Sequence, residues 1–355
     1  MDFDFADILI NVMELGASDL HITAAAPPMV RLRGRLQPLD YPKLSPQDTR
    51  EIVYSILTEE QRKRLENEWQ IDFSYTIPGR ARFRVNAFYQ RATVGAAFRL
   101  IPTRMPQLKD LGVPSVLEEF TKKPRGFVLV TGPTGSGKST TLAAMLDLIN
   151  TERHEHILTI EDPIEFLHPH KGCIVNQREI GSDAQSFGLG LKAALREDPD
   201  VILVGEMRDL EPISTALTAA ETGHLVFATL HTQDCAQTVD RIIDVFPPSQ
   251  QDQVRVQLSV ALQGVCTQQL LPTADGKGRI LAAEVLVPTP AVRNLIREGK
   301  THQIYSSMQA GGKYGMQTMD QALAGLVKAG ITTMATALER CANADDLKRL
   351  VGGGA

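Results

Sequence analysis

The chain has 355 residues, 43% of them hydrophobic, and this length predicts two domains because a single core stops growing at about 250–300 residues. The formal net charge of −5 disfavours a non-specific nucleic-acid binder, since such proteins gain affinity by neutralising phosphates. The four cysteines form no C-x-x-C pair, which argues against a zinc module or a thioredoxin-type dithiol and favours a reduced, cytosolic setting.

The first hundred residues combine helix and strand patterns. Apolar residues at helical spacing predict a short amphipathic helix over residues 5–16, where Gly16 acts as a stop signal. A second helix is expected between residues 46 and 69. Strands are expected at 20–23, 29–32 and 72–77, followed by a hairpin of 81–89 and 93–100 whose alternation gives one buried and one polar face. We therefore expect a mixed α+β domain over residues 1–100.

The amino-terminal sequence lacks the features of a targeting segment. Asp2, Asp4 and Asp7 stand where a secretory signal would be basic. No uninterrupted apolar run approaches the roughly 18 residues that a membrane span needs. The sequence therefore predicts a soluble, cytoplasmic protein, which could still dock on a membrane protein.

Residues 101–116 are predicted to link the two domains. The stretch IPTRMPQLKDLGVP has three prolines in fourteen residues, and proline disfavours both a continuous helix and a central strand. The domain boundary is therefore placed there.

The second domain, residues 117–355, begins with alternating strand and helix patterns. Strands are expected at 127–131, 157–160, 201–204 and 225–229, and helices from residue 138, through 189–196 and through 213–221. This alternation predicts an α/β fold with a parallel sheet between layers of helices. Residues 234–346 look mostly helical, with room for a strand pair around 279–287.

The run GPTGSGKST at residues 132–140 matches the phosphate-binding pattern G-x-x-x-x-G-K-[ST]. It joins a predicted strand to a predicted helix, so its backbone N–H groups and the helix N-terminus should point into one anion-binding cavity. Lys138 is expected to reach the β- and γ-phosphates of ATP, and the Ser139 hydroxyl to bind Mg²⁺. The nucleotide-binding residues predicted here are Gly132, Pro133, Thr134, Gly135, Ser136, Gly137, Lys138, Ser139 and Thr140. The alternative is a glycine-rich turn that binds no ligand.

Carboxylates follow two of the predicted strands. Glu206 is the candidate for polarising the attacking water; the alternative is a solvated charge at a strand end. The segment TIEDPIE at 159–165 places Glu161, Asp162 and Glu165 at the end of the neighbouring strand, where loops of a parallel sheet line the ligand crevice. These acids are expected to contact the nucleotide site and to organise Mg²⁺, with Glu161 as the metal candidate, directly or through water. Helix capping or a salt bridge is the alternative.

Two histidines flank the last predicted strand of this series, HLVFATLH. His224 opens the strand and His231 closes it at the crevice end, about 20 Å or more apart if the strand is fully extended. A neutral histidine can hydrogen-bond a phosphate or orient a carboxylate. We expect His231 to act in catalysis and His224 to contact the nucleotide; for each, a purely structural role is the alternative.

Residues 80–99 contain five arginines and no acidic residue. Arg82 and Arg84 share one strand face by the two-residue period, and Arg99 lies in the expected partner strand. Arginine stabilises the charge on a transferring phosphoryl group, and supply from a neighbouring subunit makes hydrolysis depend on assembly. The alternative is a solvated basic face, or ion pairs with acids elsewhere.

With these motifs in this order, the sequence resembles the secretion ATPases of type II secretion, type IV pilus and type IV secretion machines. The matching motifs are a Walker A loop at 132–139, an Asp box at 159–165, an atypical Walker B ending DVILVGEMRD at 200–209 and a His box at 224–232. The segment AVRNLIRE at 291–298 resembles a sequence associated with the pilus retraction motors of this family, with Val292 where isoleucine is common.

The resemblance implies a PAS-like amino-terminal domain, a RecA-like core and a homohexameric ring that hydrolyses Mg-ATP. In that picture Glu206 is the general base, the Asp and His boxes order the site, and the amino-terminal arginines help to complete it. It further implies a motor at the inner face of the bacterial inner membrane. The partners implied are a PilC-like platform protein and a PilU-like paralogue, and no nucleic acid is expected.

Other functions stay open at this point. Pilus-assembly and type II secretion motors usually carry a tetracysteine zinc element and a longer amino-terminal region, which this sequence lacks, whereas a PilU-like accessory ATPase shares the same boxes. A nucleic-acid translocase is the alternative of another class, against which the acidic balance argues. A nucleotide-dependent scaffold with negligible turnover is a third, disfavoured by Glu206.

The resemblance implies a coupling role for the AVRNLIRE segment, and the alternative is a purely structural one. Val292, Leu295 and Ile296 at helical spacing predict a packed helix face. The solvated side would then carry Arg293, Arg297 and Glu298.

Overall fold

A computed structural model gives the fold and describes residues 5–77, 80–102 and 105–353. The chain divides into two compact units, Met1–Arg104 with Glu165–Leu167, and Met105–Ile164 with His168–Ala355. None of the helices in the described ranges has the length and hydrophobicity that a bilayer crossing requires.

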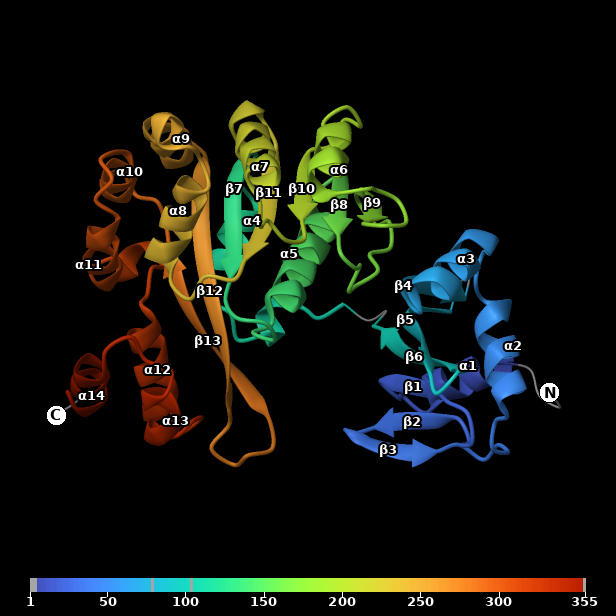
Figure 1. Cartoon of the computed structure of the whole chain (residues 1–355). Helices are drawn as coiled ribbons and strands as arrows, with labels where there is room; N and C mark the ends of the chain where they lie inside the picture. The colour runs from blue at the N-terminus through green and yellow to red at the C-terminus, as the bar shows by residue number, and fades with distance from the viewer. Residues whose placement is uncertain (1–4, 78–79, 103–104, 354–355) are drawn as a thin grey trace. The chain divides into compact units, whose positions relative to one another are not determined.

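The amino-terminal unit is built on a six-stranded antiparallel sheet in the order β3-β2-β1-β6-β5-β4 (Figure 1). One face packs against helices, with Phe83, Val85 and Phe98 of the sheet in one core with Ile8 and Leu9 of α1. The elements are α1 (Phe5–Glu14), β1 (Asp19–Ile22), β2 (Met29–Leu32), β3 (Arg35–Pro38), α2 (Pro46–Ser55), α3 (Glu59–Glu68), β4 (Gln70–Ile77), β5 (Ala81–Gln90) and β6 (Thr93–Ile101). The predicted hairpin and its alternation are confirmed, whereas β3 was not predicted because all of its residues are exposed.

The single helix predicted between residues 46 and 69 is wrong, because the structure has two helices there. The second begins at Thr58, whose side chain accepts a hydrogen bond from the Gln61 backbone while the Gln61 side chain accepts from the Thr58 N–H. This capping box satisfies amide groups that a continuous helix would bond internally. Its signature, a threonine three residues before a glutamine, was present in the sequence.

The second unit contains a seven-stranded sheet in the order β13-β12-β7-β11-β10-β8-β9. Its strands are β7 (Gly126–Thr131), β8 (His156–Glu161), β9 (Ile174–Glu179), β10 (Val201–Val204), β11 (Leu225–Leu230), β12 (Leu262–Pro272) and β13 (Arg279–Leu286). All neighbours pair in parallel except the edge strand β13, which is antiparallel to β12. The predicted parallel sheet between helical layers is therefore confirmed, with one antiparallel edge.

Helices cover both faces of this sheet and form two cores. One core holds residues of α6 (Phe187–Ala194), α7 (Leu210–Thr222), α8 (Cys235–Asp244), α9 (Pro248–Ala261), α10 (Pro290–Arg297) and α11 (Ile304–Gln309). The other holds residues of α4 (Val116–Thr121) and α5 (Lys138–Glu152). A further cluster joins α12 (Met319–Lys328), α13 (Met334–Leu338) and α14 (Ala344–Gly352) to the β12–β13 pair. Burial on both faces explains why the inner strands read as continuous apolar runs.

In this unit the strands β9 and β12 were not predicted: the strand pair expected around 279–287 is β13 alone there, and its partner is the earlier strand β12. Strand β9 lies at the sheet edge and is largely polar, with Ile174 exposed, so it lacks the apolar run of the inner strands. Strand β12 follows α9 without an intervening glycine or proline, so the helical pattern hides its start.

The AVRNLIRE segment forms α10, and its predicted solvated side is partly wrong. Val292 and Ile296 are buried as expected. Arg293 is not solvated, because its guanidinium donates to the backbone carbonyls of Ser259 and Val260 at the end of α9, and burial lowers its pKa. A cation there satisfies carbonyls at the negative end of the helix dipole, so Arg293 fastens α10 to α9.

Candidate active site

Four consecutive parallel strands bring the predicted motifs to one edge of the sheet. Strands β7, β11, β10 and β8 are neighbours in that order, so their carboxyl ends lie together. The phosphate loop follows β7, His231 follows β11, Glu206 follows β10 and Glu161 ends β8. Segments that are 100 residues apart in the sequence thus meet at a single edge.

The loop 132–140 has the backbone geometry of a phosphate cradle. Gly132, Gly135 and Gly137 all have positive φ angles, of 134°, 79° and 90°, a region that side chains disfavour. A Cβ on Gly132 would also collide with the Gln268 carbonyl oxygen and with the Ser136 hydroxyl at 2.8 Å. Gly137 is the N-cap of α5 and supplies no side-chain cap, so the first-turn N–H groups of α5 remain available to an anion.

Lys138 folds back over this loop. Its Nζ donates to the backbone carbonyls of Gly132 at 2.8 Å and Pro133 at 3.1 Å. Below it the Ser136 side chain is buried, and its Oγ has no hydrogen-bond partner among the described residues. A buried hydroxyl left without a partner costs free energy, so the loop is built to accept a further polar group. Ser139 and Thr140 are half-buried at the start of α5.

Glu206 is held by two basic side chains. Its Oε1 accepts from Arg208 Nε at 2.6 Å and lies 2.8 Å from His231 Nε2, while its Oε2 accepts from Arg208 Nη2 at 2.8 Å. Burial raises the pKa of the Glu206 carboxyl, but the hydrogen bond from Arg208 and the charges of His231 and Arg208 outweigh it and hold the pKa below its usual value. Glu206 is therefore an ionised carboxylate at the sheet edge, in contact with the predicted histidine.

A chain of buried hydroxyls runs beneath the loops. Thr131, the last residue of β7, contacts Thr267 at 2.8 Å and Thr238 at 3.4 Å between hydroxyl oxygens. Thr238 in turn contacts the hydroxyl of Thr232 at 2.6 Å. Because Thr232 follows His231, this chain ties the start of the phosphate loop to the histidine loop.

The acidic cluster divides between the sheet edge and the surface. The Glu161 carboxylate accepts from the Thr159 hydroxyl at 2.6 Å and from Gln177 Nε2 at 3.1 Å, which fixes its orientation. Asp162 is exposed next to it. Glu165 is exposed and belongs to the segment Glu165–Leu167 that clusters with the amino-terminal unit, so its contact with the nucleotide stays a prediction.

His224 lies at the opposite end of β11 from His231. Its Nδ1 is 3.0 Å from the Ala219 carbonyl oxygen, and its own carbonyl accepts from the Gly126 N–H, where β7 begins. The structure therefore places His224 at the amino-terminal edge of the sheet, away from the phosphate loop of the same chain.

The predicted arginines lie on the outer face of the amino-terminal sheet. Arg84 and Arg99 are directly opposite each other in the β5–β6 register, and Arg99 pairs with Asp19 at 2.9 Å. Arg84 is exposed and shows no ion pair or hydrogen bond within the described residues, whereas Arg82 is half-buried. Like charges opposite each other repel, and Asp19 pairs with Arg99 and, at 3.8 Å, with Arg31 rather than with Arg84, so the Arg84 charge is not compensated by this carboxylate.

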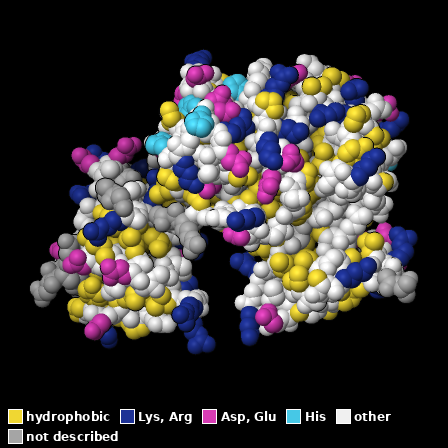
Figure 2. Space-filling view, turned by 180° about the vertical axis from the view of Figure 1, so that it is seen from behind, with side chains coloured by type: hydrophobic (Ala, Val, Ile, Leu, Met, Phe, Trp, Pro, Cys, Tyr) yellow, Lys and Arg dark blue, Asp and Glu magenta, His cyan; other side chains and the backbone are white. Residues whose placement is uncertain are grey.

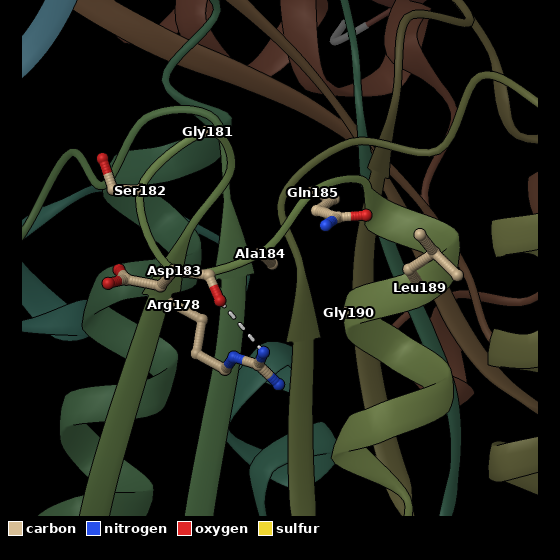
Figure 3. A pocket seen from close by; sticks show the side chains of 8 residues that line it. All are labelled: Arg178, Gly181, Ser182, Asp183, Ala184, Gln185, Leu189 and Gly190. Atoms are coloured by element: carbon tan, nitrogen blue, oxygen red, sulfur yellow. Dashed lines mark hydrogen bonds between the residues drawn. The ribbon is translucent and has the colours of Figure 1, made fainter. Parts of the chain in front are cut away.

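A separate cavity of about 500 Å³ lies beyond the end of β9 (Figure 3). It is lined by Arg178, Gly181, Ser182, Asp183, Ala184, Gln185, Leu189 and Gly190. Arg178 spans it by donating to the Asp183 carbonyl at 3.0 Å. None of the predicted site residues lines this cavity, and β9 lies four strands from β7, so it is not the phosphate site.

The most prominent site residue that the sequence did not predict is Arg208. It is two residues from Glu206, and an extended segment places such residues on one side. The i, i+2 spacing after a strand was the signal that could have predicted contact between Arg208 and Glu206. An exposed arginine next to acidic residues is, however, equally typical of a solvated charge.

Comparisons with known proteins agree with this geometry. The family described as "Type II/IV secretion system protein" matches residues 4–339. The type IV pilus retraction ATPase PilT of Pseudomonas aeruginosa is 52% identical over 337 residues, covering 95% of this chain and 98% of that protein. The type IV pilus ATPase PilU of the same organism is 44% identical, covering 98% and 91%. A crystal structure of the pilus retraction motor PilT with bound ADP has a TM-score of 0.92 at 52% identity, covering 98% and 100%.

Proposed function

The chain belongs to the type II/IV secretion system protein family, and on that basis we propose that it is an ATP-hydrolysing motor that retracts type IV pili. The similarity to PilT, higher than that to PilU, supports retraction. The observation that carries the proposal is the single sheet edge that holds the phosphate loop, His231 and Glu206.

The loop residues 132–140 are proposed to bind the triphosphate of ATP. The positive-φ glycines turn backbone N–H groups inward, and the uncapped N-terminus of α5 adds its positive end. Lys138 would exchange its two loop carbonyls for the β- and γ-phosphates, and Ser136 would gain a partner for its buried hydroxyl.

The donor set also fits Mg²⁺, which prefers oxygen ligands. The Ser139 hydroxyl and the oriented Glu161 carboxylate would hold it, with Asp162 beside them. Mg²⁺ is usually bound through one or two protein ligands together with substrate phosphates and water, so these side chains suffice for such a site. When bound, the ion neutralises charge on the phosphates.

Glu206 is proposed to act as general base. Glu206 follows β10, which lies two strands from β7, a strand spacing of about 10 Å that a triphosphate and a water molecule can span. His231 would orient that carboxylate from the intervening strand, and Thr232 and Thr238 would link its loop to the phosphate loop.

The chain is further proposed to form a homohexamer in which arginines reach the nucleotide of a neighbouring subunit. Arg84 is the strongest candidate because its charge is exposed and is not compensated by Asp19, while Arg82 and Arg99 would support it. A nucleic-acid translocase has less support, since acidic and basic side chains are interspersed on the face of the larger unit in Figure 2.

Mixed rings test the arginine proposal. Arg84→Ala and Glu206→Gln chains should each be inactive alone, whereas a mixture should regain part of the turnover, because some interfaces then combine an intact arginine with an intact carboxylate. Phosphate release is measured across mixing ratios. A tag on one variant verifies that mixed rings form. If turnover is then not restored at any ratio, the proposal of a site shared between subunits is wrong.

The proposed setting is the cytoplasmic face of the bacterial inner membrane, with a PilC-like platform protein as the partner that receives the force and a PilU-like paralogue as a second one. Deletion of the gene in its native host tests this. We expect more surface pili together with lost twitching motility. Bald cells would instead indicate an assembly motor, and unchanged pili and motility would contradict both roles.

A further inference from the structure

Arg208 is the one basic side chain at the site that the proposed chemistry does not use. One edge of its guanidinium is committed to Glu206, through Nε to Oε1 at 2.6 Å and Nη2 to Oε2 at 2.8 Å. This is the planar forked pair that arginine forms with carboxylates. The Arg208 side chain is nevertheless 74% exposed, so no packing holds it in place.

The backbone around this pair is hydrogen-bonded to both neighbouring strands. The Gly205 N–H donates to Ile160 O at 2.7 Å, and the Met207 N–H donates to Thr229 O at 3.2 Å. The Met207 side chain is buried in the core, on the side opposite its two neighbours. Glu206 and Arg208 therefore emerge from a segment anchored to both adjacent strands.

The forked pair occupies the acceptor sites that a general base needs. A carboxylate offers about four lone-pair sites. Two accept from Arg208, and one on Oε1 faces His231. A water molecule is left with a single site on Oε2, beside a guanidinium that opposes proton uptake by the carboxylate.

We infer that Arg208 is a positioning residue that restrains the Glu206 carboxylate through the forked pair, and that turnover requires its guanidinium to leave the carboxylate. This inference rests on the proposed function. Its new content is that the base is inactive while the forked pair with Arg208 is intact.

Other anions can receive Arg208 once it leaves. The hydrogen bond and charge of Glu206 raise the pKa of Arg208, and the charges of Asp162 and Asp209 raise it further. A bound nucleoside triphosphate would bring additional negative charge to the same sheet edge, and arginine pairs well with phosphate. Entry of the substrate would thereby weaken the restraint on the base.

The test replaces Arg208 and measures steady-state ATP hydrolysis. Arg208→Gln should raise kcat about two- to five-fold, the range expected for losing an exposed ion pair, with KM changed less than two-fold. Arg208→Lys should fall between Arg208→Gln and the unmodified chain, because an ammonium group cannot form the fork. In a Glu206→Gln background the replacement should have no effect, since the carboxylate that it restrains is gone.

Arg349→Gln is the matched control, because Arg349 is 75% exposed and pairs with Asp346 at 2.8 Å on α14. It should leave kcat unchanged. If Arg208→Gln lowers kcat or leaves it constant, at an unchanged melting temperature, the inference that Arg208 restrains Glu206 is wrong. It is also wrong if Arg208→Gln raises kcat in the Glu206→Gln background. If Glu206→Gln alone hydrolyses ATP normally, the assignment of the base fails instead, and the two failures are thus distinguishable.

Discussion

Lys138→Ala is expected to lower kcat/KM for ATP by about 100-fold or more, the loss typical of removing one preorganised donor to a transferring phosphoryl group. The ammonium group already lies within the loop, 2.8 Å from the Gly132 carbonyl oxygen, so it needs only a local movement to meet a phosphate. No other lysine or arginine lies within residues 132–140, so nothing in the loop can replace its charge. Phosphate release and nucleotide binding are measured together.

Lys122→Ala serves as the control for this change. Lys122 is an exposed lysine whose ion pair with Glu119 lies on α4. The Lys122→Ala variant should keep a turnover within two-fold of that of the unmodified chain. If Lys138→Ala keeps wild-type turnover, the phosphate loop is not part of the nucleotide site, whatever the other residues do.

Glu206→Gln is expected to bind ATP with nearly unchanged affinity while kcat falls by about 10²–10⁴-fold, the contribution typical of a general base. The amide keeps the shape of the side chain and can still accept from Arg208 or His231, but it cannot take a proton from water. Single-turnover hydrolysis and equilibrium binding of a fluorescent ATP analogue separate the two effects.

Glu211→Gln provides the comparison, because Glu211 is an exposed acid of α7 that pairs with Lys192. Its kcat should stay within two-fold. If Glu206→Gln loses binding and keeps the chemical step, Glu206 has a structural role and the catalytic carboxylate must be sought among Glu161 and Asp162.

The phosphate loop and the strands behind it were predictable because local rules decide them. Glycines at 132, 135 and 137 have few roles other than to allow positive φ, and continuous apolar runs such as VILV fit a strand that is buried on both faces. The order β7-β11-β10-β8 differs from the order of these strands in the chain and was not predicted. Glu206 and His231 were assigned to one crevice because each follows a predicted parallel strand at its carboxyl end.

The features of the site that could not be predicted from the sequence depend on tertiary contacts. The fork between Arg208 and Glu206 needs both side chains to turn to one side of an anchored loop, and the attachment of Arg293 to α9 needs the end of a helix more than thirty residues away. His224 and His231 flank the same strand, β11. Because its six residues separate the two histidines, they lie at opposite edges of the sheet, and a common motif does not imply a common site.

The central claim is that the turn at residues 132–140 grips the triphosphate of a nucleotide. Calorimetric titration of the folded chain with ATP in the presence of Mg²⁺ tests it most directly. The account predicts saturable binding of one nucleotide per chain, abolished by Lys138→Ala at an unchanged melting temperature. Absence of binding by the original chain, or equal binding by the variant, would contradict it.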